Sequence, residues 1–164
     1  MSELKEAYFA GGCFWGVEYF FENYKGVQSA ISGYMGGHLN NPSYREVCGG
    51  MTGHLEVVKV TYNPSVVSFE ELSILFFETH DFTQTNGQGP DIGSQYLSAI
   101  FYNNTEEKKI SKNLIDILES KGYSVATKLI SSTNTPFFEA ESYHQDYYFV
   151  HNKVPYCHSY KKVF

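Results

Sequence analysis

Three cysteines, Cys13, Cys48 and Cys157, are the side chains of this 164-residue sequence best suited to covalent chemistry. A thiolate is a strong nucleophile, and its sulfur can be oxidised to a sulfenic acid or joined in a disulfide. The number of cysteines is odd and the first residues lack a signal-peptide pattern. Both features favour thiol chemistry in a cytoplasmic protein over a framework of structural disulfides.

The residues around Cys13 are expected to place it where a strand turns into a helix. Residues 6–10 have the aromatic and apolar content of a short buried strand. Beyond Cys13, apolar side chains recur at helical spacing and the pattern stops at Gly26: Phe14, Val17, Phe20, Phe21 and Tyr24. Free N–H groups and the positive dipole end at a helix start favour a thiolate. Glycines on both sides would also let backbone approach a substrate, so we expect a reactive thiol rather than a packing cysteine.

Composition and spacing argue against several other classes of function. The net charge is −6, and no Lys/Arg cluster or membrane-length apolar run occurs, so neither a nucleic-acid nor a membrane partner is expected. The Gly87-Gln88-Gly89 stretch is not a dinucleotide loop, because Pro90 interrupts it and Ile92 takes the third glycine position. Six histidines and the cysteines never adopt paired ligand spacing. We therefore predict neither metal nor cofactor, and interpret His144 and His151 as surface or packing residues.

Strand and helix patterns alternate along the rest of the chain. Strands are predicted over residues 27–34, 56–62, 96–102 and, at a sheet edge, 124–130. Helices are predicted after a Ser68–Glu71 capping box, after a cap at Thr105 with an end at Gly122, and around residues 140–149. Two long segments without periodicity, 35–53 and 83–94, are expected to be functional loops.

This order predicts an α+β fold, a two-layer α/β sandwich with a ferredoxin-like core. A doubly wound parallel sheet is the alternative. We expect one domain over residues 1–164, in which residues 131–164 form a weakly structured C-terminal tail.

Four segments together resemble the methionine sulfoxide reductase A family, which reduces the S epimer of methionine sulfoxide. They are Gly-Cys-Phe-Trp-Gly at 12–16, Gly-His-x-Glu at 53–56, Asp-Ile-Gly-x-Gln-Tyr at 91–96 and Pro-Tyr-Cys-His at 155–158. The resemblance spans nearly the whole chain. It implies a peptide-methionine (S)-S-oxide reductase that repairs oxidative damage, acts on free or protein-bound methionine sulfoxide, and is recycled by thioredoxin or a similar dithiol.

The resemblance also implies roles for individual residues. Cys13 is the expected nucleophile and Glu56 the expected acid. Tyr44 and Tyr96 are expected to donate hydrogen bonds to the sulfoxide oxygen. These roles fit the chemistry, because that oxygen is a poor leaving group and requires a proton and hydrogen-bond donors. Without the motif, Glu56 would be interpreted as an outward-facing strand residue.

Further residues are expected to bind substrate. Phe14 and Trp15 resemble the apolar wall that receives the substrate methyl group, and so select its shape and chirality. Asp91 resembles the residue that receives the substrate's backbone amide or supports the region of Tyr96. Its alternative interpretation is a turn-forming Asp after Pro90.

The resemblance identifies Cys157 as the resolving cysteine, which condenses with the sulfenic acid of Cys13. Here the sequence departs from the family pattern, since the usual preceding glycine is absent and Tyr156 follows Pro155. Cys48 is interpreted as a buried packing residue. No further tail cysteine follows, so direct reduction of a Cys13–Cys157 disulfide is expected. A cysteine hydrolase and a non-catalytic binder of oxidised methionine remain as alternatives.

Overall fold

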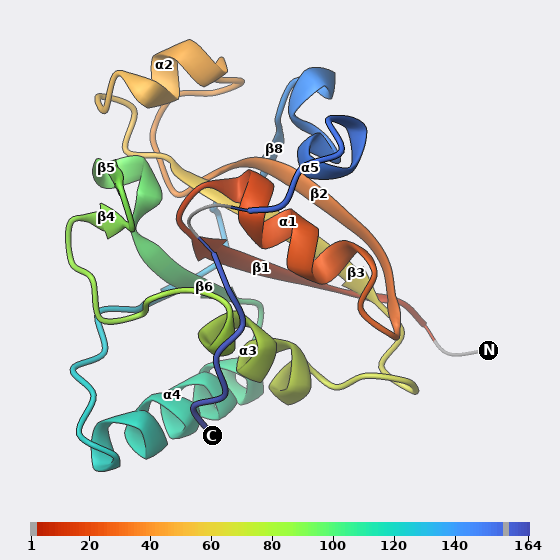
Figure 1. The fold of residues 1–164 in the computed structure, drawn as a ribbon, viewed down its shortest axis with the longest axis vertical. Coiled ribbons are helices and arrows are strands. Elements are labelled where there is room, and N and C mark those ends of the chain that lie inside the picture. Colours follow the sequence, from red (N-terminus) through yellow and green to blue (C-terminus); the bar gives the residue numbers. More distant parts are fainter. Residues whose placement is uncertain (1–2, 156–157) are drawn as a thin grey trace.

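A computed structural model describes residues 3–155 and 158–164 of the chain (Figure 1). Cys157, the predicted resolving cysteine, lies outside the described residues.

A six-stranded sheet forms one layer, in the order β7-β6-β1-β3-β2-β8. Its strands are β1 (Lys5–Gly11), β2 (Val27–Met35), β3 (Leu55–Tyr62), β6 (Ser98–Tyr102), β7 (Lys128–Ser131) and β8 (Phe138–Glu139). All neighbours pair antiparallel except β6 and β7, which are parallel. The inner order β6-β1-β3-β2, with helices after β1 and β3, is that of a ferredoxin-like core, so the α+β prediction is confirmed. The doubly wound alternative is wrong, because it requires a parallel sheet.

Three helices cover one face of this sheet (Figure 1). They are α1 (Phe14–Glu22), α3 (Phe69–Glu78) and α4 (Thr105–Ser120). Strand side chains alternate between the faces, so Ala7 and Phe9 of β1 join the core under the helices while Ala10 packs in a smaller cluster on the opposite face. Apolar strand and helix faces therefore meet in one aromatic-rich core.

The register brings the ends of four strands together at one end of the sheet. Gly11, which ends β1, pairs with Ser98, which begins β6. Tyr34, near the end of β2, pairs with Glu56, near the start of β3. Connections that leave or enter these strands consequently gather at the N-terminus of α1.

The two segments predicted as loops contain short elements that the patterns did not indicate. The first holds α2 (Tyr44–Cys48), which begins at a capping box of Ser43 and Glu46. The second holds a hairpin of β4 (Gly87–Gln88) and β5 (Asp91–Ile92), followed by the 3-10 helix η1 (Ser94–Tyr96). One helical turn and two-residue strands are too short to show periodicity.

Several predicted boundaries differ from the structure by a few residues. The capping box at Ser68 and Glu71 is confirmed. The predicted cap at Thr105 is wrong, because the side chain of Asn104 caps α4 by accepting from the N–H of Glu107. The strand predicted over 96–102 begins only after η1, and β7 begins later than the predicted 124. The helix predicted around 140–149 is two short pieces, η2 (Ser142–His144) and α5 (Tyr147–Val150).

Residues 158–164 form neither helix nor strand, yet they are held on the end of α3. Glu78 accepts hydrogen bonds from the Tyr160 hydroxyl at 3.0 Å and from the Val163 N–H at 2.9 Å. Its carbonyl accepts from the Lys161 N–H at 2.7 Å. Figure 1 shows this segment, in dark blue, descending past α1 towards α3. In the described part of the chain, no helix is both long and apolar enough to cross a membrane.

Phe9 gives a test of the packing that unites the two layers. Its ring is fully buried and stacks on Phe21 and Phe76, each with centroids 5.1 Å away. Phe9→Ala should lower the free energy of unfolding by about 3–5 kcal/mol, measured by urea denaturation, because a cavity remains. Val66→Ala, at a side chain 47% exposed, should change it by less than about 0.5 kcal/mol. Equal losses for the two variants would contradict this description of the core.

Candidate active site

Cys13 lies between β1 and α1, as predicted, and is the N-cap residue of α1. It is only 6% exposed, and its carbonyl accepts from the Gly16 N–H at 3.1 Å. The sulfur is thus carried on a rigid strand-to-helix corner at the end of the sheet where the strand ends gather.

The glycines beside Cys13 leave room for side chains from other segments of the protein, and Gly12 has a positive φ that other residues rarely adopt. Gly12 has φ +94°, and a Cβ there would lie 2.4 Å from the Cβ of Gln88. A Cβ on Gly16 would lie 2.2 Å from Nδ1 of His158. Gln88 is itself fixed to the backbone of Asp81, donating to its carbonyl and accepting from its N–H. The β4–β5 hairpin and the tail are therefore packed against the Cys13 corner.

Glu56 faces the helix layer from β3 and is 1% exposed. Its Oε1 accepts the N–H of Phe14, the first residue of α1, at 3.1 Å, while its buried Oε2 has no hydrogen-bond partner among residues 3–155 and 158–164. The pKa of Glu56 is raised to about 8, chiefly by burial; the Phe14 hydrogen bond opposes this shift and the Asp91 charge adds to it. At neutral pH the carboxyl is consequently protonated. Because Oε1 is accepting, the proton belongs on Oε2.

Tyr44 and Tyr96 lie within the electrostatic reach of this carboxyl. Tyr44 begins α2 and Tyr96 ends η1, and both rings are half-buried. Burial chiefly raises the pKa of each phenol, and the charge of Glu56 raises both further. Cys13 also contributes to the raised pKa of Tyr96. The structure thus brings two neutral hydroxyl donors to the region of Glu56 and Cys13, although they come from segments predicted to be a loop and a strand.

Phe14 and Trp15 carry an aromatic wall next to the cysteine. Phe14 is fully buried against Tyr34, with ring centroids 5.6 Å apart. Trp15 is half-buried and stacks on Tyr147, with ring centroids 3.7 Å apart. Its Nε1–H donates to Nδ1 of His144 at 3.0 Å, which makes that histidine the neutral Nε2–H tautomer. The wall combines apolar faces with oriented N–H groups.

Glu141, which no sequence pattern indicated, connects this wall to Tyr44. Its carboxylate accepts from the Tyr34 hydroxyl at 2.9 Å and from the Tyr44 N–H at 3.0 Å. His144 is buried, as the packing interpretation required, whereas His151 is exposed. Glu141, His144 and Tyr147 follow one another every three residues, but the short helical pieces there offer too few turns for a recognisable pattern.

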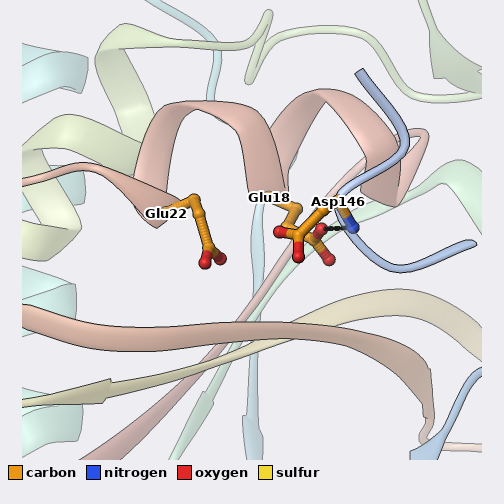
Figure 2. A group of neighbouring side chains, drawn as sticks. All are labelled: Glu18, Glu22 and Asp146. Carbon is orange, nitrogen blue, oxygen red and sulfur yellow. Dashed lines mark hydrogen bonds between the residues drawn. The ribbon is translucent and has the colours of Figure 1, made fainter. Parts of the chain in front are cut away.

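A cluster of carboxyl groups fixes the segment that carries these residues (Figure 2). Glu18, buried on α1, accepts from the Ser32 hydroxyl at 2.6 Å and from the backbone N–H of Asp146. Side-chain oxygens of Glu18, Glu22 and Asp146 lie within 4.8 Å of one another. The pKa of Glu18 is raised to about 7, chiefly by burial; the hydrogen bonds from Ser32 and the Asp146 N–H oppose this shift, and the charges of Asp146 and Glu22 add to it. A proton bound by Glu18 would lower the repulsion among the three groups, and the Asp146 N–H bond attaches the C-terminal segment to α1.

Asp91 and the remaining cysteines have different positions. Asp91 lies half-buried in β5, paired with Gln88, and its charge reaches Glu56 and Tyr96. The interpretation of Cys48 as a buried packing residue is wrong, because it is exposed at the C-terminal end of α2. The Tyr44 hydroxyl bonds its thiol and lowers its pKa, but partial covering of the sulfur and the charge of Glu56 leave that pKa raised.

The buried acids predict a pH-dependent stability. Folding raises the pKa of Glu18 and Glu56, so the native state binds more protons than the unfolded state until pH exceeds about 8. The free energy of unfolding should therefore fall as pH rises from about 7 to about 8, by up to about 1.4 kcal/mol per pH unit for each of the two groups that is still protonated in the native state. The buried histidines, whose pKa values are lowered from 6.5, have the opposite effect on stability, but only around and below that pH, where the unfolded state binds their protons.

Glu56→Gln should flatten this slope, measured by urea denaturation across the same pH range. The exposed Glu70→Gln is the matched control, and its slope should equal that of the natural chain. A Glu56→Gln slope identical to the control would show that Glu56 is ionised in the native state.

Comparison with known proteins relates this arrangement to a single family. The family model described as peptide methionine sulfoxide reductase matches residues 5–163. The peptide methionine sulfoxide reductase MsrA of Sulfolobus acidocaldarius is 48% identical over 155 residues, which cover 94% of this chain and 87% of that protein. MsrA 1 of Rhodopirellula baltica is 47% identical over 148 residues, covering 90% and 77%.

Solved structures agree with the sequence comparison. Mxr1 of Saccharomyces cerevisiae in its reduced form has a TM-score of 0.87 at 33% identity, covering 97% of this chain and 93% of that one. Methionine sulfoxide reductase A of Corynebacterium diphtheriae has a TM-score of 0.82 at 34% identity, covering 94% and 77%. The chain belongs to the peptide methionine sulfoxide reductase family.

Proposed function

We propose that this protein reduces the S epimer of methionine sulfoxide, free or in oxidised proteins, to methionine. The observation that carries the proposal is the buried, protonated carboxyl of Glu56, beside the Cys13 corner, whose Oε2 has no hydrogen-bond partner in the described part of the chain. A carboxyl that is protonated at neutral pH can act as a general acid, and a sulfoxide oxygen can accept its proton.

In the first step, the Cys13 thiolate attacks the sulfoxide sulfur while Glu56 delivers its proton to the sulfoxide oxygen. The hydroxyls of Tyr44 and Tyr96, held neutral by their raised pKa values, donate hydrogen bonds to the same oxygen. The oxygen is transferred to the cysteine sulfur. Thiolate, sulfoxide and one proton thus become a sulfenic acid and a thioether, and two electrons leave the sulfur of Cys13.

The aromatic wall supplies the selectivity. The faces of Phe14 and Trp15 would receive the substrate methyl group and orient the sulfoxide oxygen towards Glu56. Stacking of Trp15 on Tyr147 and its hydrogen bond to His144 restrict the indole to one orientation. Asp91, on the hairpin beside the site, would accept the backbone amide of the modified methionine. This arrangement distinguishes the two sulfoxide epimers by shape.

In the second step, the thiol of Cys157 condenses with the sulfenic acid of Cys13 to give a disulfide and water. Thioredoxin or a similar dithiol then reduces this disulfide, in the cytoplasm, where such reductants are kept reduced. Residues 1–164 thereby act as one catalytic domain whose segment 131–164 supplies the resolving cysteine. Cys48 takes no part in this cycle.

Thiol counting tests this cycle and separates it from a cysteine hydrolase or a passive binder. Without reductant, the natural chain should lose two thiols and release one methionine for each molecule of protein. Cys157→Ser should release about one methionine and stop at the sulfenic acid, and Cys13→Ser should release none. Cys48→Ser is the matched control and should cycle with thioredoxin at nearly the natural rate. A Cys13–Cys48 disulfide detected by mass spectrometry would contradict the proposal that Cys157 is the resolving cysteine.

Replacing Glu56 tests the proton transfer itself. Glu56→Gln should slow the single-turnover release of methionine by about 10²–10⁴-fold and flatten its pH dependence, because an amide cannot transfer the proton. Rapid-quench measurement of methionine at several pH values gives the rate. Glu70→Gln, at an exposed site on α3, should keep the natural rate. An unchanged single-turnover rate in Glu56→Gln would remove Glu56 from the mechanism.

A further inference from the structure

We infer that His158 is a positioning residue for disulfide formation, because it anchors the tail to the Cys13 corner directly after Cys157. The inference rests on the proposed function, since it concerns how the resolving thiol is kept near the sulfenic acid.

The anchor is a buried hydrogen bond between the tail and the end of β1. His158 is 5% exposed, and its Nε2–H donates to the carbonyl of Gly11 at 2.6 Å. A carbonyl can only accept, so this contact requires the proton on Nε2. Burial lowers the pKa of His158, which keeps the ring neutral. Gly11 precedes Cys13 by two residues, so the anchor acts on the backbone that carries the nucleophile.

The imidazole also fits a space that the glycines around Cys13 leave for it. A Cβ on Gly16 would lie 2.2 Å from Nδ1 and 2.7 Å from Cγ of His158, distances that no real side chain tolerates. A Cβ on Gly12 would lie 3.6 Å from Nε2. The ring is therefore seated between the residues on both sides of Cys13. Gly16→Ala would therefore displace the imidazole of His158 from this position.

The residues that follow His158 are also attached to the body of the protein, so the position of His158 is restricted both by its own contacts and by theirs. Tyr160, Lys161 and Val163 are all bonded to Glu78 on α3. On the other side of Cys157, the backbone N–H of Lys153 donates to the carbonyl of Tyr148, which ties the chain to α5. The chain is thus attached to the body of the protein at Lys153 and again from His158 onward.

The anchor at His158 limits how far the Cys157 thiol can be from the Cys13 corner, because the two residues are adjacent in the chain. Consecutive Cα atoms are about 3.8 Å apart, and a disulfide requires Cα atoms roughly 4.4–6.8 Å apart. The covalent bond between Cys157 and an anchored residue limits how far the resolving thiol can move from the Cys13 corner, which raises its effective concentration at the sulfenic acid. In the step itself, the Cys157 sulfur bonds to the Cys13 sulfur, the S–O bond breaks, and the hydroxyl leaves as water with the thiol proton. His158 supplies no proton to this step.

The two half-reactions test the inference separately in His158→Phe and His158→Gln. With methionine sulfoxide and no reductant, both variants should release the first methionine at a rate within about twofold of the natural chain. Loss of the two thiols should be slower by about tenfold or more in His158→Phe, since the phenyl ring fills the space but cannot donate. His158→Gln, whose amide can donate to Gly11, should recover part of that rate. Dimedone labelling should trap the accumulated sulfenic acid of Cys13 in His158→Phe.

His38→Phe, which replaces an exposed histidine outside the site, is the matched control and should form the disulfide at the natural rate. Disulfide formation at the natural rate in His158→Phe would overturn the inference. Loss of the first methionine in both His158 variants would also overturn it, because the residue would then serve the fold or the first step. A natural chain that released no methionine would instead contradict the proposed function, and the inference would fall with it.

Discussion

The hydrogen bond from the Phe14 N–H to Oε1 of Glu56 is the contact on which the site depends. It joins the first residue of α1 to β3, and so fixes the strand-to-helix corner of Cys13 relative to the sheet. It also gives Oε1 of a buried carboxyl a hydrogen-bond donor. Because that bond fixes the orientation of the carboxyl group, it fixes the position of Oε2 as well. A single donor does not offset the loss of hydration, so the carboxyl retains its proton at neutral pH.

The rest of the fold shields that carboxyl from solvent and places the hydroxyl groups of Tyr44 and Tyr96 in its region. Antiparallel pairing brings four strand ends to the corner, and the aromatic wall on α1 closes it. The C-terminal segment is held over this wall by Glu141 and Glu18 on one side of Cys157, and by His158 and Glu78 on the other. The described part of this segment, which has only short regular elements, is therefore held by specific hydrogen bonds to buried or half-buried acceptors as well as by packing.

Much of this arrangement follows from local sequence signals. Period-two and helical patterns predicted the ferredoxin-like core, and the glycine-flanked Cys13 predicted the corner. The missed features lack such signals for physical reasons. The helix that begins at Tyr44 is one turn long, and the acceptors Glu141 and Glu18 act across more than 90 residues of sequence. Interpretation of Cys48 as packing failed because a small apolar side chain beside Val47 does not reveal which face of so short a helix is exposed.

The protonation state of Glu56 is the central claim, and it can be measured directly. A ¹³C NMR titration of carboxyl-labelled glutamate, with Glu56→Gln used to assign the resonance, reports the pKa of this group in the native protein. The account predicts a midpoint near 8, with the carboxyl neutral at pH 7. A midpoint near the ordinary value of 4.5 would show an ionised carboxylate, which accepts hydrogen bonds but cannot deliver the proton that the sulfoxide oxygen requires.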